Sequence, residues 1–157
     1  MTKKAISKQT SLRNMKFNRY LMIRYFTAGY FFVNLYWLIL LVSLHKITWL
    51  LPASLLIGLV GVCCEQVKQY QQPSQKLPLA TFYYWLQLGI NVLLLISLYT
   101  PLFNAFYPFV KPTGKILMLL ILLVGCLGCL VLERRLHLIL HNKDRYYQAL
   151  KDFEALI

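Results

Sequence analysis

Acidic side chains are scarce in this chain, with five Asp and Glu against 17 Lys and Arg in 157 residues. It contains no G-x-S-x-G sequence, no phosphate-binding loop and no paired carboxylates within an apolar stretch. These absences remove the usual signatures of a serine hydrolase, a nucleotide-binding enzyme and a carboxylate proton relay. Long polar stretches are also missing, which leaves no room for a soluble catalytic domain. We therefore expect a protein that is not an enzyme and needs no cofactor.

Four apolar stretches fill most of the chain, at approximately 25–44, 47–64, 79–99 and 116–132. A hydrocarbon core about 30 Å thick is crossed by about 20 helical residues, so each stretch is long enough to span it. Hydrophobic residues make up 59% of the chain and charged ones 14%, whereas soluble domains carry about 45–50% and about 25%. The sequence predicts an all-α, multi-pass membrane protein built as a four-transmembrane-helix bundle.

The basic residues are distributed unevenly around these spans. Fourteen of the 17 lie before span one, between spans two and three, or after span four: Lys3, Lys4, Lys8, Arg13, Lys16, Arg19, Arg24, Lys68, Lys76, Arg134, Arg135, Lys143, Arg145 and Lys151. By the positive-inside rule, both termini and the middle loop are cytoplasmic, and we expect a bacterial plasma membrane. Basic residues near the surface also attract the anionic inner leaflet. Nothing in the basic segments provides a nucleic-acid recognition motif, so nucleic acid is not an expected partner.

Three regions follow from this pattern. Residues 1–18 form a basic cytoplasmic tail, predicted to be disordered or loosely membrane-bound because it is polar. Residues 19–141 form the four-helix transmembrane domain. Within it, the outer loop 99–115 carries three prolines and five aromatic residues. That loop is too apolar to be free, so we expect it to cap the bundle. Residues 142–157 are predicted to form a cytoplasmic amphipathic helix.

The C-terminal prediction depends on helical periodicity. From Glu133 onward the chain has no Gly or Pro, so span four is expected to extend into the cytoplasm as one helix. Apolar residues recur there at helical spacing. They are Ile139, Tyr146, Leu150, Phe153 and Ile157. An exposed apolar stripe requires lipid or protein, so the candidates are a membrane-protein partner, a homodimer contact, or the inner leaflet.

Three polar residues fall near the middle of apolar spans: Asn34 in span one, and Gln87 and Asn91 in span three. Gln87 and Asn91 are four residues apart and so share a helix face. Polar groups inside a membrane are costly and are either bonded between helices or functional. One interpretation is interhelical hydrogen bonding that holds the bundle together. The other is a site for a small ligand or a lipid headgroup.

Four cysteines lie in spans two and four: Cys63, Cys64, Cys126 and Cys129. Four thiols on two helices can form a thiolate metal site or a redox relay. However, the predicted topology places them in the cytoplasmic half of the membrane, where thiols stay reduced. We therefore interpret them as small core residues. Small residues at spacings of four, Ser54–Gly58 and Gly125–Cys129, predict that spans two and four pack directly.

Glu133, His137 and His141 are spaced by four at the inner interface. A helical His pair at this spacing can bind zinc, with the carboxylate as a third ligand. No HExxH sequence or fourth ligand accompanies them. An interfacial polar face with a Glu133–His137 pair explains them more simply, and metal binding is not expected.

The C-terminal segment ERRLHLILHNKDRYYQALKDFE and the loop composition resemble small four-span membrane proteins of Gram-positive bacteria. Some of those proteins are labelled as a cellobiose subunit of the phosphotransferase system. The phosphorylated subunit of that system is a soluble domain, which this chain lacks, so the resemblance implies no phosphoryl transfer.

Three functional hypotheses remain open. The first is a non-enzymatic accessory or regulatory subunit that binds a larger membrane partner through the C-terminal stripe. The second is a small bundle that binds or transports a solute or lipid through Asn34, Gln87 and Asn91. The third is a thiol-redox or metal-binding membrane protein.

Overall fold

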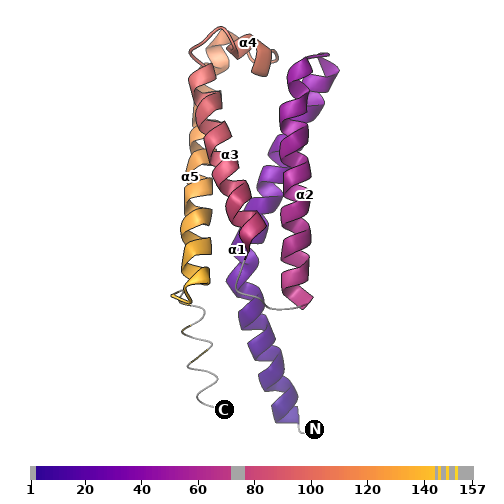
Figure 1. Cartoon of the computed structure of the whole chain (residues 1–157), viewed down its shortest axis with the longest axis vertical. Helices are drawn as coiled ribbons and strands as arrows, with labels where there is room; N and C mark the ends of the chain where they lie inside the picture. The colour runs from indigo at the N-terminus through magenta and orange to yellow at the C-terminus, as the bar shows by residue number, and fades with distance from the viewer. Residues whose placement is uncertain (1–2, 72–76, 144, 146–147, 149–150, 152–157) are drawn as a thin grey trace.

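The computed structural model describes residues 3–71, 77–143, 145, 148 and 151. Every regular element in this part is helical: α1 (Lys3–Ser43), η1 (Ile47–Trp49), α2 (Leu50–Gln71), α3 (Pro78–Ser97), α4 (Phe103–Phe106), η2 (Pro112–Gly114) and α5 (Lys115–Leu140) (Figure 1). Four segments are long and apolar enough to cross a membrane, namely Tyr20–Ser43, Ile47–Lys68, Pro78–Ser97 and Pro112–Leu140. The predicted four-helix membrane architecture is confirmed.

The two ends of the bundle differ in chemistry. At one end, which we call the basic end, α1 begins, α2 ends, α3 begins and α5 ends (Figure 1). Lys68, Arg134 and Arg135 lie near this end. At the other, the loop end, α1 turns into α2 through η1, and the α4 segment joins α3 to α5. Lys46, Lys111 and Lys115 lie at the loop end, whereas residues 3–24 of α1 carry seven further Lys and Arg at the basic end.

Residues 3–18 are helical, so the expectation of a disordered tail was wrong. They form the first turns of α1, which projects beyond the other helices at the basic end (Figure 1). The segment contains no Gly or Pro, and span one already provides a helix nucleus. Extending an existing helix avoids the unfavourable nucleation step, so a polar segment with good helix formers continues it.

The ends of α1 and α5 share one capping motif. His45 and Asn142 have positive φ angles of 51° and 53°. The N–H of Lys46 donates to the carbonyl of Leu41 at 3.1 Å, and the N–H of Lys143 donates to that of Leu138 at 3.0 Å. A left-handed residue followed by an N–H that donates to the carbonyl five residues earlier is a Schellman motif.

The predicted single helix through span four and the C-terminus was therefore wrong at this point. α5 ends at Leu140, and the left-handed Asn142 stops it without any Gly or Pro. The reason is the short amide side chain of Asn, which lowers the cost of the left-handed conformation. The four stripe residues beyond this break, Tyr146, Leu150, Phe153 and Ile157, lie outside the described residues, as does most of the predicted helix at 142–157.

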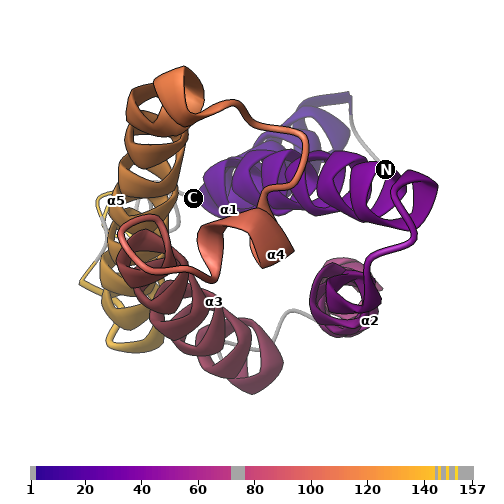
Figure 2. The ribbon, with the colours of Figure 1, turned by 90° about the horizontal axis from the view of Figure 1, so that it is seen from above.

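The helices form an open ring in the order α1, α2, α3, α5 (Figure 2). α2 and α5 occupy opposite corners, so the expected direct packing of spans two and four was wrong. The two glycines, Gly58 and Gly125, pack against α3 instead. A Cβ on Gly58 of α2 would lie 2.9 Å from the ring of Tyr83 on α3. A Cβ on Gly125 of α5 would lie 3.0 Å from the amide of Asn91, also on α3.

The loop 99–115 covers the loop end of the bundle, as predicted (Figure 2). Phe103 and Tyr107 are buried in one core cluster with Leu94, Leu98 and Leu122 from α3, the loop and α5. Two hydrogen bonds join this cap to the helical hairpin formed by α1, η1 and α2. The indole N–H of Trp37 donates to the carbonyl of Phe106 at 3.0 Å, and the hydroxyl of Thr48 donates to that of Ala105 at 2.7 Å.

Candidate functional site

A groove of about 800 Å³ lies between α1, α3 and α5. Its rim is exposed: Tyr36 on α1 and Val124 on α5 are 66% and 68% accessible. Its floor is buried, since Asn34, Gln87 and Asn91 are all 5% accessible or less. The groove therefore opens sideways between α1 and α5, toward the hydrocarbon of a surrounding bilayer.

The groove is bounded along its length by two contacts from α1. Toward the basic end, the hydroxyl of Tyr30 donates to the carbonyl of Gly125 on α5 at 2.5 Å. Toward the loop end, Trp37 stacks on Tyr107, with ring centroids 6.0 Å apart and planes at 18°. Tyr30 and Trp37 are seven residues apart on α1, about two helical turns. Asn34 lies between them, where α1 and α5 are held apart.

The amides on the α3 side form a directed hydrogen-bond chain. The hydroxyl of Tyr83 donates to Oε1 of Gln87 at 2.7 Å, and Nε2 of Gln87 donates to Oδ1 of Asn91 at 3.1 Å. The chain therefore ends at Nδ2 of Asn91, a donor with no acceptor among the described residues. Across the groove, Nδ2 of Asn34 donates to the carbonyl of Tyr30 at 2.8 Å, which leaves Oδ1 of Asn34 as an acceptor.

The structure thus brings the three predicted polar residues to one cavity but does not bond them between helices. No hydrogen bond within the described part of the chain joins Asn34 to Gln87 or Asn91. The expected interhelical amide bonding was wrong. The physical reason is the groove itself, because the cavity separates α1 from α3 at this depth. Whether these residues bind a ligand stays a prediction.

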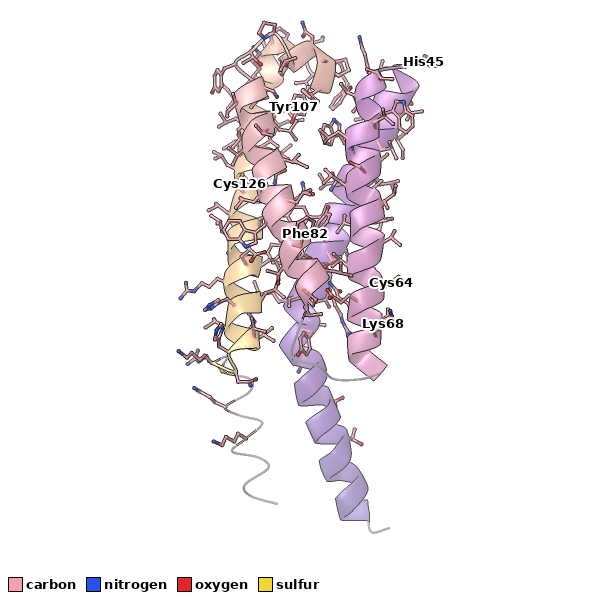
Figure 3. All side chains as sticks on the ribbon, viewed as in Figure 1. His45, Cys64, Lys68, Phe82, Tyr107 and Cys126 are labelled. Atoms are coloured by element: carbon pink, nitrogen blue, oxygen red, sulfur yellow. The ribbon has the colours of Figure 1, made fainter. Side chains whose placement is uncertain are left out.

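Tyr107 adds a polar group that the sequence reasoning did not single out. Its side chain is only 2% accessible and lines the groove near the loop end (Figure 3). Its hydroxyl is buried and has no hydrogen-bond partner among the described residues. Burial raises the pKa of Tyr107, so the phenol remains a neutral donor at physiological pH. The only available sequence signal was its place in an unusually aromatic loop.

Every residue that lines the groove is uncharged. Aromatic rings form much of the wall, namely those of Tyr25, Phe26, Tyr30, Tyr36, Trp37, Tyr107 and Phe109. A site of this volume with apolar walls and a few convergent polar groups is typical of small-molecule binding sites. The arrangement is therefore suited to holding a ligand that is largely apolar and carries an uncharged polar group.

Interhelical polar bonding is found nearer the basic end instead. The amide of Gln66 on α2 donates to Oγ1 of Thr27 on α1 at 2.8 Å, and that hydroxyl lies 2.6 Å from the hydroxyl of Tyr84 on α3. The Glu65 carboxylate accepts the backbone N–H groups of Leu79 at 3.1 Å and Ala80 at 2.8 Å. These bonds join three helices and cap α3, whose first N–H groups have no partner within the helix.

The cysteines do not converge on one site. Figure 3 shows Cys64 on α2 and Cys126 on α5 at opposite flanks of the bundle. All four thiols are free; Cys63 and Cys64 are exposed, whereas Cys129 is buried with its sulfur 3.1 Å from the Tyr30 hydroxyl. Only Cys129 thus occupies the core position that the sequence predicted for the set.

The predicted histidine face is present on α5, without the geometry of a metal centre. The rings of His137 and His141 lie 4.2 Å apart, and Nδ1 of His141 is 2.9 Å from the carbonyl of His137. Glu133 precedes them by one helical turn. Across residues 3–71 and 77–143, no three His, Cys, Asp or Glu side chains are grouped as a metal site would require.

No protein-family model, no curated protein and no solved structure matches this chain. The resemblance of its C-terminal segment to small four-span proteins therefore stays a prediction.

Proposed function

We propose that this small integral membrane protein binds an amphiphilic molecule taken from the bilayer into the groove between α1 and α5. One observation carries the proposal: buried amide groups with spare hydrogen-bonding capacity lie on the floor of an apolar groove that opens toward lipid. An unpaired polar group in an apolar medium costs about 1–3 kcal/mol. A ligand that satisfies these groups while burying its own chain offsets that cost.

The charge asymmetry supports an orientation for this binding site. With the basic end in the cytoplasm of a bacterial cell, the positive-inside rule is satisfied and the α4 cap faces outward. Binding of this kind requires no catalytic group, in keeping with the absence of catalytic sequence motifs.

Native mass spectrometry of the full chain, released gently from its membrane, tests the proposal. We expect one amphiphile to remain bound at a 1:1 ratio. Gly29 lines the groove, and a Cβ there would meet no atom within 4 Å. The substitution Gly29→Phe is therefore tolerated by the fold but occupies the groove, and it should remove the bound species.

Gly89→Phe is the matched control. Gly89 also has open space around it but lies on α3 outside the groove. The proposal would be refuted by a wild-type protein that retains no amphiphile, or by equal retention in the two variants.

A second proposal is that the chain is an accessory or regulatory subunit of a larger membrane protein, or a homodimer. Its support is the apolar stripe in the C-terminal sequence. The groove gives no support to this second proposal, because its lining can be covered by a lipid. Affinity purification of the tagged chain in mild detergent should then recover a stoichiometric partner or a second copy. Leu150→Asp with Phe153→Asp should abolish that association while leaving the bound amphiphile in place. Recovery of the monomer alone would count against this proposal.

A further inference from the structure

The floor of the groove lies far from both ends of the bundle. Asn34 lies nine residues before the end of α1, which is about 14 Å at about 1.5 Å per residue. Asn91 lies six residues before the end of α3, or about 9 Å on the same basis. Every residue that lines the groove is uncharged, and a charge at this depth in the bilayer is expensive. The polar group of the ligand is therefore neutral, which excludes a phosphate or ammonium headgroup at the floor.

Two polar atoms of the floor have no partner among the described residues and are open to the groove. One is a donor, Nδ2 of Asn91, and the other is an acceptor, Oδ1 of Asn34. Neither belongs to the fully enclosed, unbonded polar atoms of the described chain, whereas the hydroxyl of Tyr107 does. A ligand can therefore meet the two asparagine amides but not the Tyr107 hydroxyl.

The free donor and the free acceptor lie beside the same contact between helices. A Cβ on Gly125 of α5 would be 3.0 Å from Nδ2 of Asn91, so this donor lies against the backbone of Gly125. The Tyr30 hydroxyl donates to the carbonyl of that glycine. The amide of Asn34 is in turn held by the backbone carbonyl of Tyr30. The polar group of one ligand is therefore offered a donor and an acceptor in the same part of the groove.

This pair of atoms calls for a ligand group that both donates and accepts. A ketone, an ester or an ether only accepts, so it would leave Oδ1 of Asn34 unpaired in an apolar medium, which is costly. A hydroxyl is the smallest uncharged group that satisfies both atoms. It supplies one donor and two lone pairs, and its proton rotates to suit the acceptor.

We propose, building on the proposed function, that the groove takes an uncharged lipid with a free hydroxyl, which accepts a hydrogen bond from Nδ2 of Asn91 and donates one to Oδ1 of Asn34. The apolar chain of this lipid lies along the walls of the groove. It leaves through the open side between α1 and α5, where Tyr36 and Val124 are exposed. Two kinds of bilayer lipid supply this chemistry, namely diacylglycerols and long-chain isoprenoid alcohols.

Tryptophan fluorescence of the full chain in phospholipid nanodiscs tests the proposal. The probe is a long-chain primary alcohol brominated in mid-chain, because bromine quenches indole emission on contact. A variant with Trp49→Phe and Trp85→Phe retains only Trp37, in the groove wall. A control with Trp37→Phe and Trp49→Phe retains only Trp85, which is 57% exposed on α3 outside the groove. We expect saturable quenching of Trp37 and only linear, collisional quenching of Trp85.

Three unbrominated competitors of equal chain length separate the two hydrogen bonds. The alcohol donates and accepts, its methyl ether only accepts, and the alkane does neither. We expect the alcohol to displace the probe at a concentration about threefold to tenfold lower than the ether, the range for one hydrogen bond. The ether should exceed the alkane by a similar factor. Equal displacement by the alcohol and the ether, or by the ether and the alkane, would overturn the proposal.

Two substitutions in the Trp37-only background assign each bond to its residue. Asn34→Leu removes the acceptor, so the alcohol should lose its advantage over the ether. Asn91→Leu removes the donor, so the ether should become as weak as the alkane while the alcohol keeps its advantage over both. Asn104→Leu is the matched control, at an exposed position of α4 outside the groove, and should change none of these ratios. An advantage of the alcohol that survives Asn34→Leu would show that the ether is excluded by its size alone, which contradicts the hydroxyl assignment.

The remaining outcomes identify the lipid and separate this proposal from the one beneath it. Displacement of the probe by a diacylglycerol or by a polyprenol shows which of the two supplies the hydroxyl, and failure of both contradicts the proposal. If native mass spectrometry then still shows another lipid that is lost in Gly29→Phe, amphiphile binding stands and only the hydroxyl assignment fails. If the wild type retains no lipid, both proposals fail.

Discussion

Substitution of Gly128 by alanine tests whether α1 and α5 meet where the structure places them. Gly128 lies on α5 at the basic end of the groove. A Cβ at this position would be 2.8 Å from the Tyr30 hydroxyl and 3.2 Å from a ring carbon of Phe26, both on α1. The first distance is too short for carbon and oxygen, so α1 must shift or Tyr30 must leave its position.

The expected change in the free energy of unfolding combines two destabilising effects and one stabilising effect. Overpacking of a close contact costs about 1–3 kcal/mol. Displacing Tyr30 also removes its hydrogen bonds to the Gly125 carbonyl and to the Cys129 sulfur, at about 0.6 kcal/mol each by measurements on membrane helices. Against this, alanine is favoured over glycine within a helix by about 1 kcal/mol. We expect Gly128→Ala to lower the free energy of unfolding by about 1–3 kcal/mol.

The assay is reversible unfolding in mixed micelles, with helix content as the readout. Gly89→Ala is the matched control, because a Cβ there meets no atom within 4 Å and only the helix-propensity gain applies. This variant should be equal to the wild type or more stable by up to about 1 kcal/mol.

A double-mutant cycle with Tyr30→Phe locates the effect. Tyr30→Phe alone should cost about 1 kcal/mol through the lost hydrogen bonds. In the double variant the clashing hydroxyl is already gone, so the combined loss should fall short of the sum by at least about 0.5 kcal/mol. The α1–α5 contact would be refuted if the two losses of unfolding free energy added strictly, or if Gly128→Ala were as stable as Gly89→Ala. The boundary of the groove toward the basic end would then be refuted as well.

Three further outcomes follow from local contacts. Glu65→Gln weakens the cap on α3 and should cost about 0.5–2 kcal/mol of unfolding free energy, whereas the exposed Lys68→Gln should change it little. Thr48→Val removes the bond to the Ala105 carbonyl, so hydrogen exchange at 103–106 should accelerate by about threefold, as expected for about 0.6 kcal/mol; unchanged exchange would argue against a bonded cap. Because burial raises the pKa of Tyr107, its neutral form contributes stability below the unfolded pKa of about 10. That contribution is lost as the pH rises above this value. The difference in unfolding free energy between wild type and Tyr107→Phe should therefore change only above about pH 10. Unfolding measured between pH 8 and pH 12 checks this.

The sequence by itself determined the four spans, because the length of an apolar run decides whether it crosses a membrane irrespective of its neighbours. It also determined the apolar cap at 99–115, because that loop is too apolar to be free in water. Local rules failed at Asn142, where one left-handed residue ends α5 without Gly or Pro. They also failed at residues 3–18, where an adjoining helix overrides polar composition.

Only the tertiary structure decided which faces meet. The small residues Gly58 and Gly125 predicted close packing but not its partner, because any neighbouring helix benefits from a missing side chain. In the fold they receive Tyr83 and Asn91 of α3 rather than each other. Likewise, sequence spacing could identify Asn34 and Asn91 as costly in a membrane, but not whether they bond to one another or face a cavity. That outcome depends on the separation of α1 from α3 at this depth, which arises from contacts spread across the whole bundle.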